Sequence, residues 1–198
     1  MALHKLRRFV GTIAALLDEA PPEPALVDRG LAALRELVRE DDWLPDAYAA
    51  PSPERYRQYL LYADARERFS VVSFVWGPGQ RTPIHNHTVW GLIGVLRGAE
   101  YSQPYARDAS GALRENGAER LIERAQVEAV SPAIGDIHRV RNAYDDRVSV
   151  SIHVYGANIG AVRRSIWQAD GTPRTFVSGY SNDALPNLWD LSKDTTVS

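Results

Sequence analysis

The chain has 198 residues, of which 44% are hydrophobic, and a formal net charge of −2. This length and composition suit one domain, residues 1–198, with a sizeable core, and the absence of a basic stripe argues against a nucleic-acid partner. The chain contains no cysteine, which excludes disulfides, cysteine metal ligands and a cysteine nucleophile. Any metal must therefore be bound by histidine or carboxylate.

Two amphipathic helices are predicted at the N-terminus, within residues 1–50. Residues 2–19 place apolar side chains at helical spacing, and Pro21 and Pro22 then interrupt the helix. Residues 25–39 repeat the pattern. The first helix resembles a signal peptide superficially, but its apolar residues share one face and no small-x-small cleavage site follows. No apolar run is long enough to span a membrane, so we expect a cytoplasmic protein without membrane contact.

From residue 52 onward the apolar residues alternate with period two, which is typical of strands. A first strand is predicted to place four side chains on one face: Tyr56, Gln58, Leu60 and Tyr62. Further strands are predicted at 69–76, 82–87, 91–97, 100–105, 120–125, 126–130, 136–140 and 148–155, with two short ones between 163 and 177. Many short strands separated by turns predict a mainly β fold, a jelly-roll barrel over residues 51–180, followed by a loop-rich tail over 181–198.

Three histidines form the candidate metal site. His85 and His87 are two residues apart in a segment expected to be extended, where alternate side chains point to the same side. Their imidazoles can therefore reach one metal ion. His138 follows a second glycine turn at Gly135 and offers a third imidazole. Three imidazoles from two β segments are the minimum for a metal site with open coordination positions.

The spacing around these histidines resembles the two cupin motifs. The matching residues are Gly79, His85, His87 and Gly98 for the first motif and Gly135, His138 and Asn142 for the second. The acidic ligand of most cupins falls on Gly91 in this sequence. Three neutral imidazoles leave a divalent ion its full charge, which favours an anionic guest such as a thiolate. We predict Fe(II) rather than zinc, because reaction with dioxygen needs redox chemistry.

Residues 56–182 resemble the thiol dioxygenases, cupins that oxidise a small thiol with dioxygen to a sulfinic acid. The likeness rests on Pro83, His85, His87, His138, Ser151, His153, Tyr155, Arg163 and Arg164. It implies that His85, His87 and His138 bind the iron. It also implies that Ser151, His153 and Tyr155 form an outer-sphere hydrogen-bond relay. Positions i, i+2 and i+4 of one strand lie on a single face, as such a relay requires.

Two departures resemble the bacterial 3-mercaptopropionate dioxygenase branch rather than mammalian-type cysteine dioxygenase. Gln58 occupies the position of the substrate-binding arginine of the mammalian type. No cysteine is available for a crosslink to the relay tyrosine, so the phenol of Tyr155 stays free. In the bacterial branch a later arginine binds the substrate carboxylate. Arg164 is the best positional match and Arg163 the alternative, and a guanidinium suits a carboxylate because it can donate two parallel hydrogen bonds.

Three alternatives to a 3-mercaptopropionate dioxygenase remain open at this stage. The first is a dioxygenase that acts mainly on L-cysteine or cysteamine. The second is a metallo-cupin with a different reaction, and the third is a non-enzymatic cupin that binds a small ligand. A serine-hydrolase triad fits poorly, because Ser151 and His153 are strand neighbours and no glycine-flanked nucleophile elbow is present. No oligomeric state is predicted.

Overall fold

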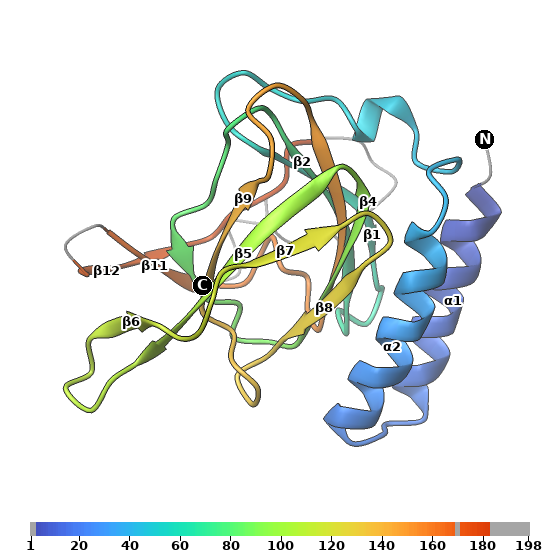
Figure 1. The fold of residues 1–198 in the computed structure, drawn as a ribbon. Helices are drawn as coiled ribbons and strands as arrows, with labels where there is room; N and C mark the ends of the chain where they lie inside the picture. The colour runs from blue at the N-terminus through green and yellow to red at the C-terminus, as the bar shows by residue number, and fades with distance from the viewer. Residues whose placement is uncertain (1–2, 169–170, 183–198) are drawn as a thin grey trace.

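In the computed structural model, which describes residues 3–168 and 171–182, two helices lie on one side of a curled β structure (Figure 1). The helices are α1 (Leu3–Asp18) and α2 (Glu23–Val38), and a short 3-10 helix, η1 (Asp46–Tyr48), follows them. Helix α2 begins two residues earlier than predicted, because Pro24 lies in its first turn, where a backbone amide needs no helical partner. Most of the predicted tail, residues 183–198, lies outside the described residues.

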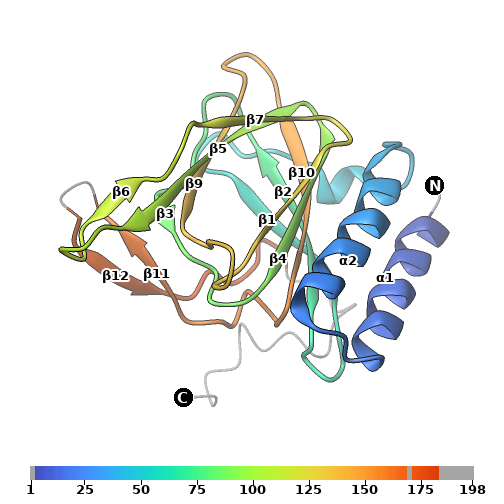
Figure 2. The ribbon, with the colours of Figure 1, turned by 60° about the horizontal axis from the view of Figure 1, so that its bottom comes forward.

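The strands of the described residues form two sheets in which every pairing is antiparallel. The first sheet contains, in spatial order, β1 (Arg57–Ala63), β2 (Ser70–Trp76), β10 (Ser149–Tyr155), β4 (Gly91–Arg97) and β8 (Val127–Val130). The second contains β12 (Pro173–Phe176), β11 (Arg164–Trp167), β3 (Ile84–His85), β9 (His138–Asn142), β5 (Ala99–Arg107) and β6 (Leu113–Glu115), with β7 (Arg120–Glu123) paired to β5. The sheets curl around a common interior (Figure 2). The predicted mainly β, cupin-like fold with two N-terminal helices is confirmed.

Strand β10 is buried on both faces, and its alternation separates the two cores of the protein. Val150, Ile152 and Val154 face outward and pack in the apolar core between the helices and the first sheet. The intervening residues face the interior of the barrel, where Tyr155 belongs to a second apolar cluster. The polar residues of this strand are therefore directed into the barrel, away from the helices.

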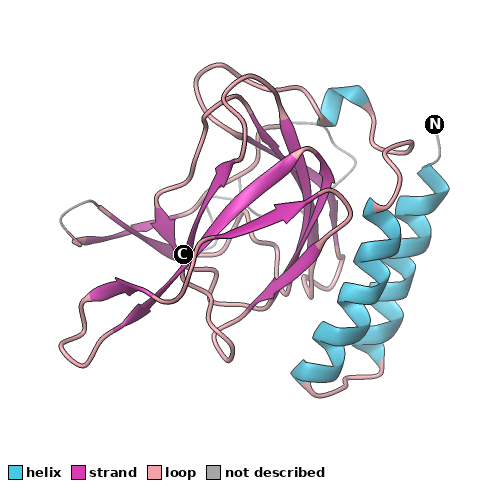
Figure 3. Cartoon of the chain, in the orientation of Figure 1, coloured by secondary structure: helices cyan, strands magenta, loops and turns pink. Residues whose placement is uncertain are grey.

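The helices cover the outside of the first sheet and lie away from the β5–β6 and β11–β12 hairpins (Figure 3). Helix α2 packs on β4 and β8. Leu34 is fully buried there against Gly94, whose Cβ, if present, would lie 3.0 Å from Leu34 Cγ. Burying one such leucine stabilises the fold by roughly 1.5–3 kcal/mol. Within the described residues, neither helix is both long and apolar enough to cross a membrane.

One detail of the predicted first strand is wrong. Tyr56 and Leu60 pack inside the barrel, as expected, but Tyr62 packs in the helix-side core, with its ring 5.4 Å from that of Phe69. The pairing of β1 with β2 shifts register between Leu60 and Tyr62. Such a β-bulge inserts one extra residue and moves the following side chain to the opposite face.

Candidate metal centre and substrate pocket

The pairing of two short strands brings the three predicted histidines together. His85 on β3 pairs directly with His138 on β9, and His87 lies two residues further along the chain. The candidate ligand atoms of the three imidazoles all lie within 4.8 Å of one another. The ring centroids are 4.8–4.9 Å apart. One ion can therefore be reached by all three rings.

Each histidine uses its Nδ1 atom for a contact within the protein. Nδ1 of His85 lies 3.1 Å from the carbonyl oxygen of Pro83, and Nδ1 of His87 lies 3.0 Å from that of Asp136. Nδ1 of His138 lies 3.2 Å from Ser102 Oγ. These contacts orient the rings and leave Nε2 as the ligand atom. Within the described residues, Nε2 of His87 is buried without a hydrogen-bond partner, and its lone pair is available to a metal ion.

Asp136, an acidic residue in contact with the His87 backbone, has a structural role. Oδ2 of Asp136 accepts hydrogen bonds from the backbone amides of His87 at 3.1 Å and Thr88 at 2.9 Å. It thereby holds the turn at Thr88, whose φ is +62°, an unusual value for a residue other than glycine. Within the described residues, the group that could hold a metal contains histidines alone. This group agrees with the expectation drawn from Gly91, which occupies the position of the usual acidic ligand: three histidines and no carboxylate.

Burial keeps the imidazoles uncharged, as metal ligands must be. It lowers the pKa of His85 to about 4, with a further lowering from the charge of Arg164. The pKa values of His87 and His138 are also well below the usual value, mainly through burial and then through the neighbouring imidazoles. All three rings are neutral at pH 7 and available to bind a cation.

Ser151, His153 and Tyr155 form a continuous chain of hydrogen bonds along the inner face of β10. Ser151 Oγ lies 2.8 Å from His153 Nε2, and His153 Nδ1 lies 2.8 Å from the hydroxyl of Tyr155. The Tyr155 ring stacks on His87 with centroids 5.4 Å apart. Burial lowers the pKa of His153 to about 3 and raises that of Tyr155, so both are neutral. The chain ends beside the metal centre.

Gly91 and Tyr155 depend on each other sterically. A Cβ atom at Gly91 would lie 3.0 Å from Cδ1 of the Tyr155 ring and 3.0 Å from a methyl group of Val130. A larger residue at position 91 would therefore require the Tyr155 ring or Val130 to shift by a few tenths of an ångström. The glycine at this position is thus matched to the observed place of the phenol.

A cavity of about 180 Å³ opens beside the histidines. It is lined by Tyr56, Gln58, Phe74, Thr82, Pro83, His85, Tyr155, Arg164, Ile166, Phe176 and Ser178. The cavity thus contains one metal-site histidine, the end of the relay and a single arginine. Its described lining includes no Asp or Glu, so its charge is positive.

Arg164 is 5% exposed, whereas Arg163 is exposed to solvent, so Arg164 is the arginine that faces the cavity. Its Nη2 donates to Ser178 Oγ at 2.6 Å, and its guanidinium lies 4.7 Å from the centre of the Phe176 ring. Its Nε is buried and lacks an acceptor within the described residues. Burial lowers the pKa of Arg164. An anion that enters the cavity would supply the missing acceptor and a counter-charge.

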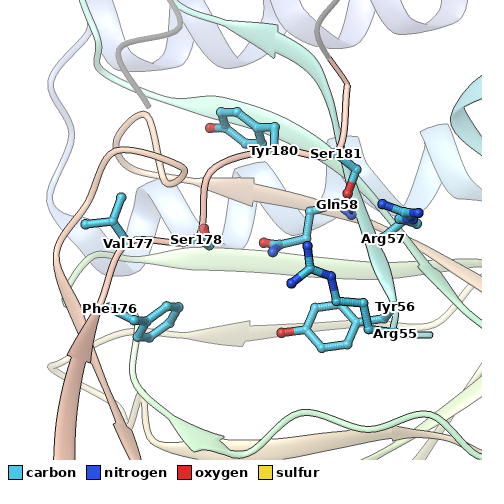
Figure 4. Close-up of a pocket in the computed structure, with 9 residues that line it drawn as sticks. All are labelled: Arg55, Tyr56, Arg57, Gln58, Phe176, Val177, Ser178, Tyr180 and Ser181. Carbon is cyan, nitrogen blue, oxygen red and sulfur yellow. Dashed lines mark hydrogen bonds between the residues drawn. The ribbon is translucent and has the colours of Figure 1, made fainter. Parts of the chain in front are cut away.

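Gln58 lines this cavity and an outer hollow of about 350 Å³ on its solvent side. Figure 4 shows the Gln58 amide and the Tyr56 hydroxyl directed toward the side that Phe176 and Ser178 form. Sequence reasoning did not single out Phe176 and Ser178. The pairing of Arg164 with Phe176 across the β11–β12 hairpin could have indicated Phe176, but no local signal marks Ser178.

Fold and site together define a cupin-like β protein with a three-histidine cluster that could hold a metal ion, beside a cationic cavity. The chain belongs to the cysteine dioxygenase type I family, whose model matches residues 7–165. Cysteine dioxygenase type 1 from Homo sapiens and from Pongo abelii are each 27% identical to it over 128 residues. The match spans 62% of this chain and 62% of the length of those relatives.

Solved structures with similar folds are more distant in sequence. An uncharacterised double-stranded β-helix protein from Klebsiella pneumoniae is 15% identical, with a TM-score of 0.46, over 69% of this chain and 97% of its own. A cupin 2 domain-containing protein from Halorhodospira halophila is 14% identical, with a TM-score of 0.46, over 67% of this chain and 83% of its own.

Proposed function

We propose that this protein is an Fe(II)-dependent thiol dioxygenase that oxidises a small thiol carboxylate, preferably 3-mercaptopropionate, to its sulfinic acid. The observation that carries the proposal is a three-histidine cluster with a buried arginine in the cavity beside it. His85 of the cluster and Arg164 line the same cavity, and the buried Nε of Arg164 lacks an acceptor within the described residues. Membership of the cysteine dioxygenase type I family supports the same reaction class.

The residues divide the work of binding and orienting the substrate. The guanidinium of Arg164 binds the carboxylate, because it is desolvated and offers fork-like donors. This contact directs the thiol end of the molecule toward the histidines. The hydroxyl of Tyr155 donates a hydrogen bond into the cavity, held in position by His153. An iron ion held by the histidines would supply the positive charge that deprotonates the thiol and the redox chemistry with dioxygen.

The reaction balances without a further reductant. A thiolate, R–S⁻, and one dioxygen molecule give a sulfinate, R–SO2⁻, and the electrons that reduce dioxygen all come from sulfur. Two sulfur–oxygen bonds form and the oxygen–oxygen bond breaks. The cavity must therefore admit a thiol and dioxygen together.

The charge of the cavity favours 3-mercaptopropionate over cysteine. The two thiols differ by an ammonium group, and burying an unpaired charge is costly. The described lining offers Gln58 but no carboxylate to that ammonium. Cysteine remains the second candidate substrate, because the family model and the curated relatives are cysteine dioxygenases.

A panel of thiols tests the proposal. We expect iron-loaded protein to consume dioxygen with 3-mercaptopropionate, more slowly with cysteine, and least with cysteamine, which has no carboxylate for Arg164. The measurement is thiol-dependent oxygen uptake with quantification of the sulfinate product. A preference for cysteine over 3-mercaptopropionate would refute the substrate assignment. Uptake with none of the three would refute the dioxygenase itself.

Tyr155→Phe tests the role of the relay. The substitution removes the hydroxyl but keeps the ring that stacks on His87. We expect iron content to stay at the wild-type level while turnover falls by about 100- to 10,000-fold, the usual contribution of a positioned proton donor. Metal analysis and steady-state kinetics on the same preparation make the comparison. Loss of iron from the variant would instead indicate that Tyr155 supports the metal site itself.

A further inference from the structure

A buried acid lies at the inner end of the hydrogen-bond chain. Glu100 is on β5 and is 1% exposed, and neither of its carboxyl oxygens has a hydrogen-bond partner among the residues that the structure describes. The carboxyl faces Ser151 and Trp76, close enough for both to favour its charged form, although neither makes a hydrogen bond of good geometry to it. The proposed function gives this side chain no role. Burying a charged carboxylate without a partner is costly, which favours the protonated form, and a buried polar group without a partner calls for an explanation.

The charges around Glu100 favour its neutral form. Burial, with a smaller contribution from the nearby carboxylate of Glu128, raises its pKa to about 8 against the lowering by Ser151 and Trp76. Burial also raises the pKa of Glu128, but its ion pair with Arg120 at 2.8 Å favours the charged form, so we assign the negative charge to Glu128. Tyr155 also interacts electrostatically with Glu100, and it is neutral because burial raises its pKa. Of two acids in one low-dielectric interior, one therefore holds a proton at pH 7.

The hydrogen bonds of the relay can run in either of two donor-to-acceptor directions. His153 is neutral and carries one ring proton, which can be on Nδ1 or on Nε2. Ser151 Oγ already accepts a hydrogen bond from Trp76 Nε1 at 3.2 Å and has one proton to donate. That proton goes either to His153 or to Glu100. The choice fixes whether Tyr155 donates to His153 or points its own proton into the cavity.

We propose that Glu100 is a positioning residue that sets the direction of the relay. In its protonated form it donates to Ser151, which then donates to His153 Nε2. The proton of His153 is then on Nδ1 and is donated to the Tyr155 oxygen, so the Tyr155 hydroxyl donates into the cavity. In its ionised form Glu100 accepts a hydrogen bond from Ser151. The proton of His153 is then on Nε2 and is donated to Ser151 Oγ, and the Tyr155 hydroxyl donates to His153 Nδ1.

This inference predicts the sign of a pH effect. The active direction requires protonated Glu100, so it predominates at neutral pH and is lost as pH rises through about 8. The expected effect of this pH change on turnover rests on the proposed function. The expected change in the tautomer of His153 does not, because it is a property of the protein alone.

Histidine nitrogen NMR on metal-free protein tests the inference without any thiol. The chain has five histidines, and a His153→Gln variant assigns the relevant signal. We expect the His153 proton to be on Nδ1 at pH 7 and to move to Nε2 above about pH 8 in the wild type. In Glu100→Gln, which is isosteric but cannot ionise, the tautomer should not change with pH. An unchanged wild-type tautomer across this range, or a pH-dependent one in Glu100→Gln, would overturn the proposal.

Glu128→Gln is the matched variant, because it removes the like charge but leaves Glu100 in place. We expect its tautomer transition at lower pH than in the wild type, and a transition at the same or higher pH counts against the inference. In iron-loaded enzyme, kcat should show the same shift, and Glu100→Gln should lack the alkaline loss altogether. If no thiol drives oxygen uptake, the proposed function fails, whereas the NMR result still decides the role of Glu100.

Discussion

His87→Ala is expected to abolish metal binding without unfolding the protein. The ring is fully buried, and its Nε2 has no other partner, so its loss leaves two imidazoles for an ion that needs three. Since changes to groups that merely orient a ligand cost about 10- to 100-fold in metal affinity, removing the ligand itself should cost more than 100-fold. Iron content after dialysis measures the effect, and circular dichroism monitors the fold.

His4→Ala provides the matched control for this variant. His4 lies exposed on α1, within the helical layer outside the first sheet, and should leave the iron content unchanged. Full iron occupancy in His87→Ala would contradict the three-histidine site. Equal iron loss in both variants would show that histidine number, rather than this cluster, determines binding.

Arg164→Ala is expected to discriminate between substrates by their carboxylate. Truncating one partner of a buried charged contact costs about 2–4 kcal/mol, which corresponds to roughly 30- to 1000-fold in kcat/KM. We expect a loss of this size for 3-mercaptopropionate and little change for cysteamine. Arg164→Lys should recover only part of the loss, because an ammonium cannot donate two parallel hydrogen bonds to a carboxylate.

Arg163→Ala is the neighbouring control, since Arg163 is exposed and outside the cavity. It should behave as wild type with every thiol. Equal losses with 3-mercaptopropionate and cysteamine in Arg164→Ala would remove the carboxylate role. That result would indicate that Arg164 mainly supports the cavity wall through Ser178 and Phe176.

The local sequence was sufficient for the parts of the site that lie within one short segment. His85 and His87 are positioned by extended backbone, and the shared face of Ser151, His153 and Tyr155 follows from strand alternation alone. The strands β2, β4 and β10 were predicted within one residue of their bounds, because each is a compact run of apolar residues between turns. These features need no knowledge of tertiary pairing.

Features that depend on the pairing of distant segments could not be predicted from the sequence. The bulge in β1 is defined only by its pairing with β2, so the sequence could not predict that Tyr62 packs on the opposite face from Leu60. Ser178 reaches Arg164 only because β11 and β12 form a hairpin. Glu100 looked like an ordinary strand residue, since its burial beside Ser151 requires β5 and β10 to share one barrel interior.

The most direct test of thiol dioxygenation follows the oxygen atoms. Iron-loaded protein is supplied with 3-mercaptopropionate and isotopically labelled dioxygen in unlabelled water, and the product is analysed by mass spectrometry. We predict a sulfinic acid that carries both labelled atoms, formed in equal amount to the dioxygen consumed. A disulfide with hydrogen peroxide, or a sulfinic acid with oxygen from water, would contradict the assignment of the three-histidine site to this reaction.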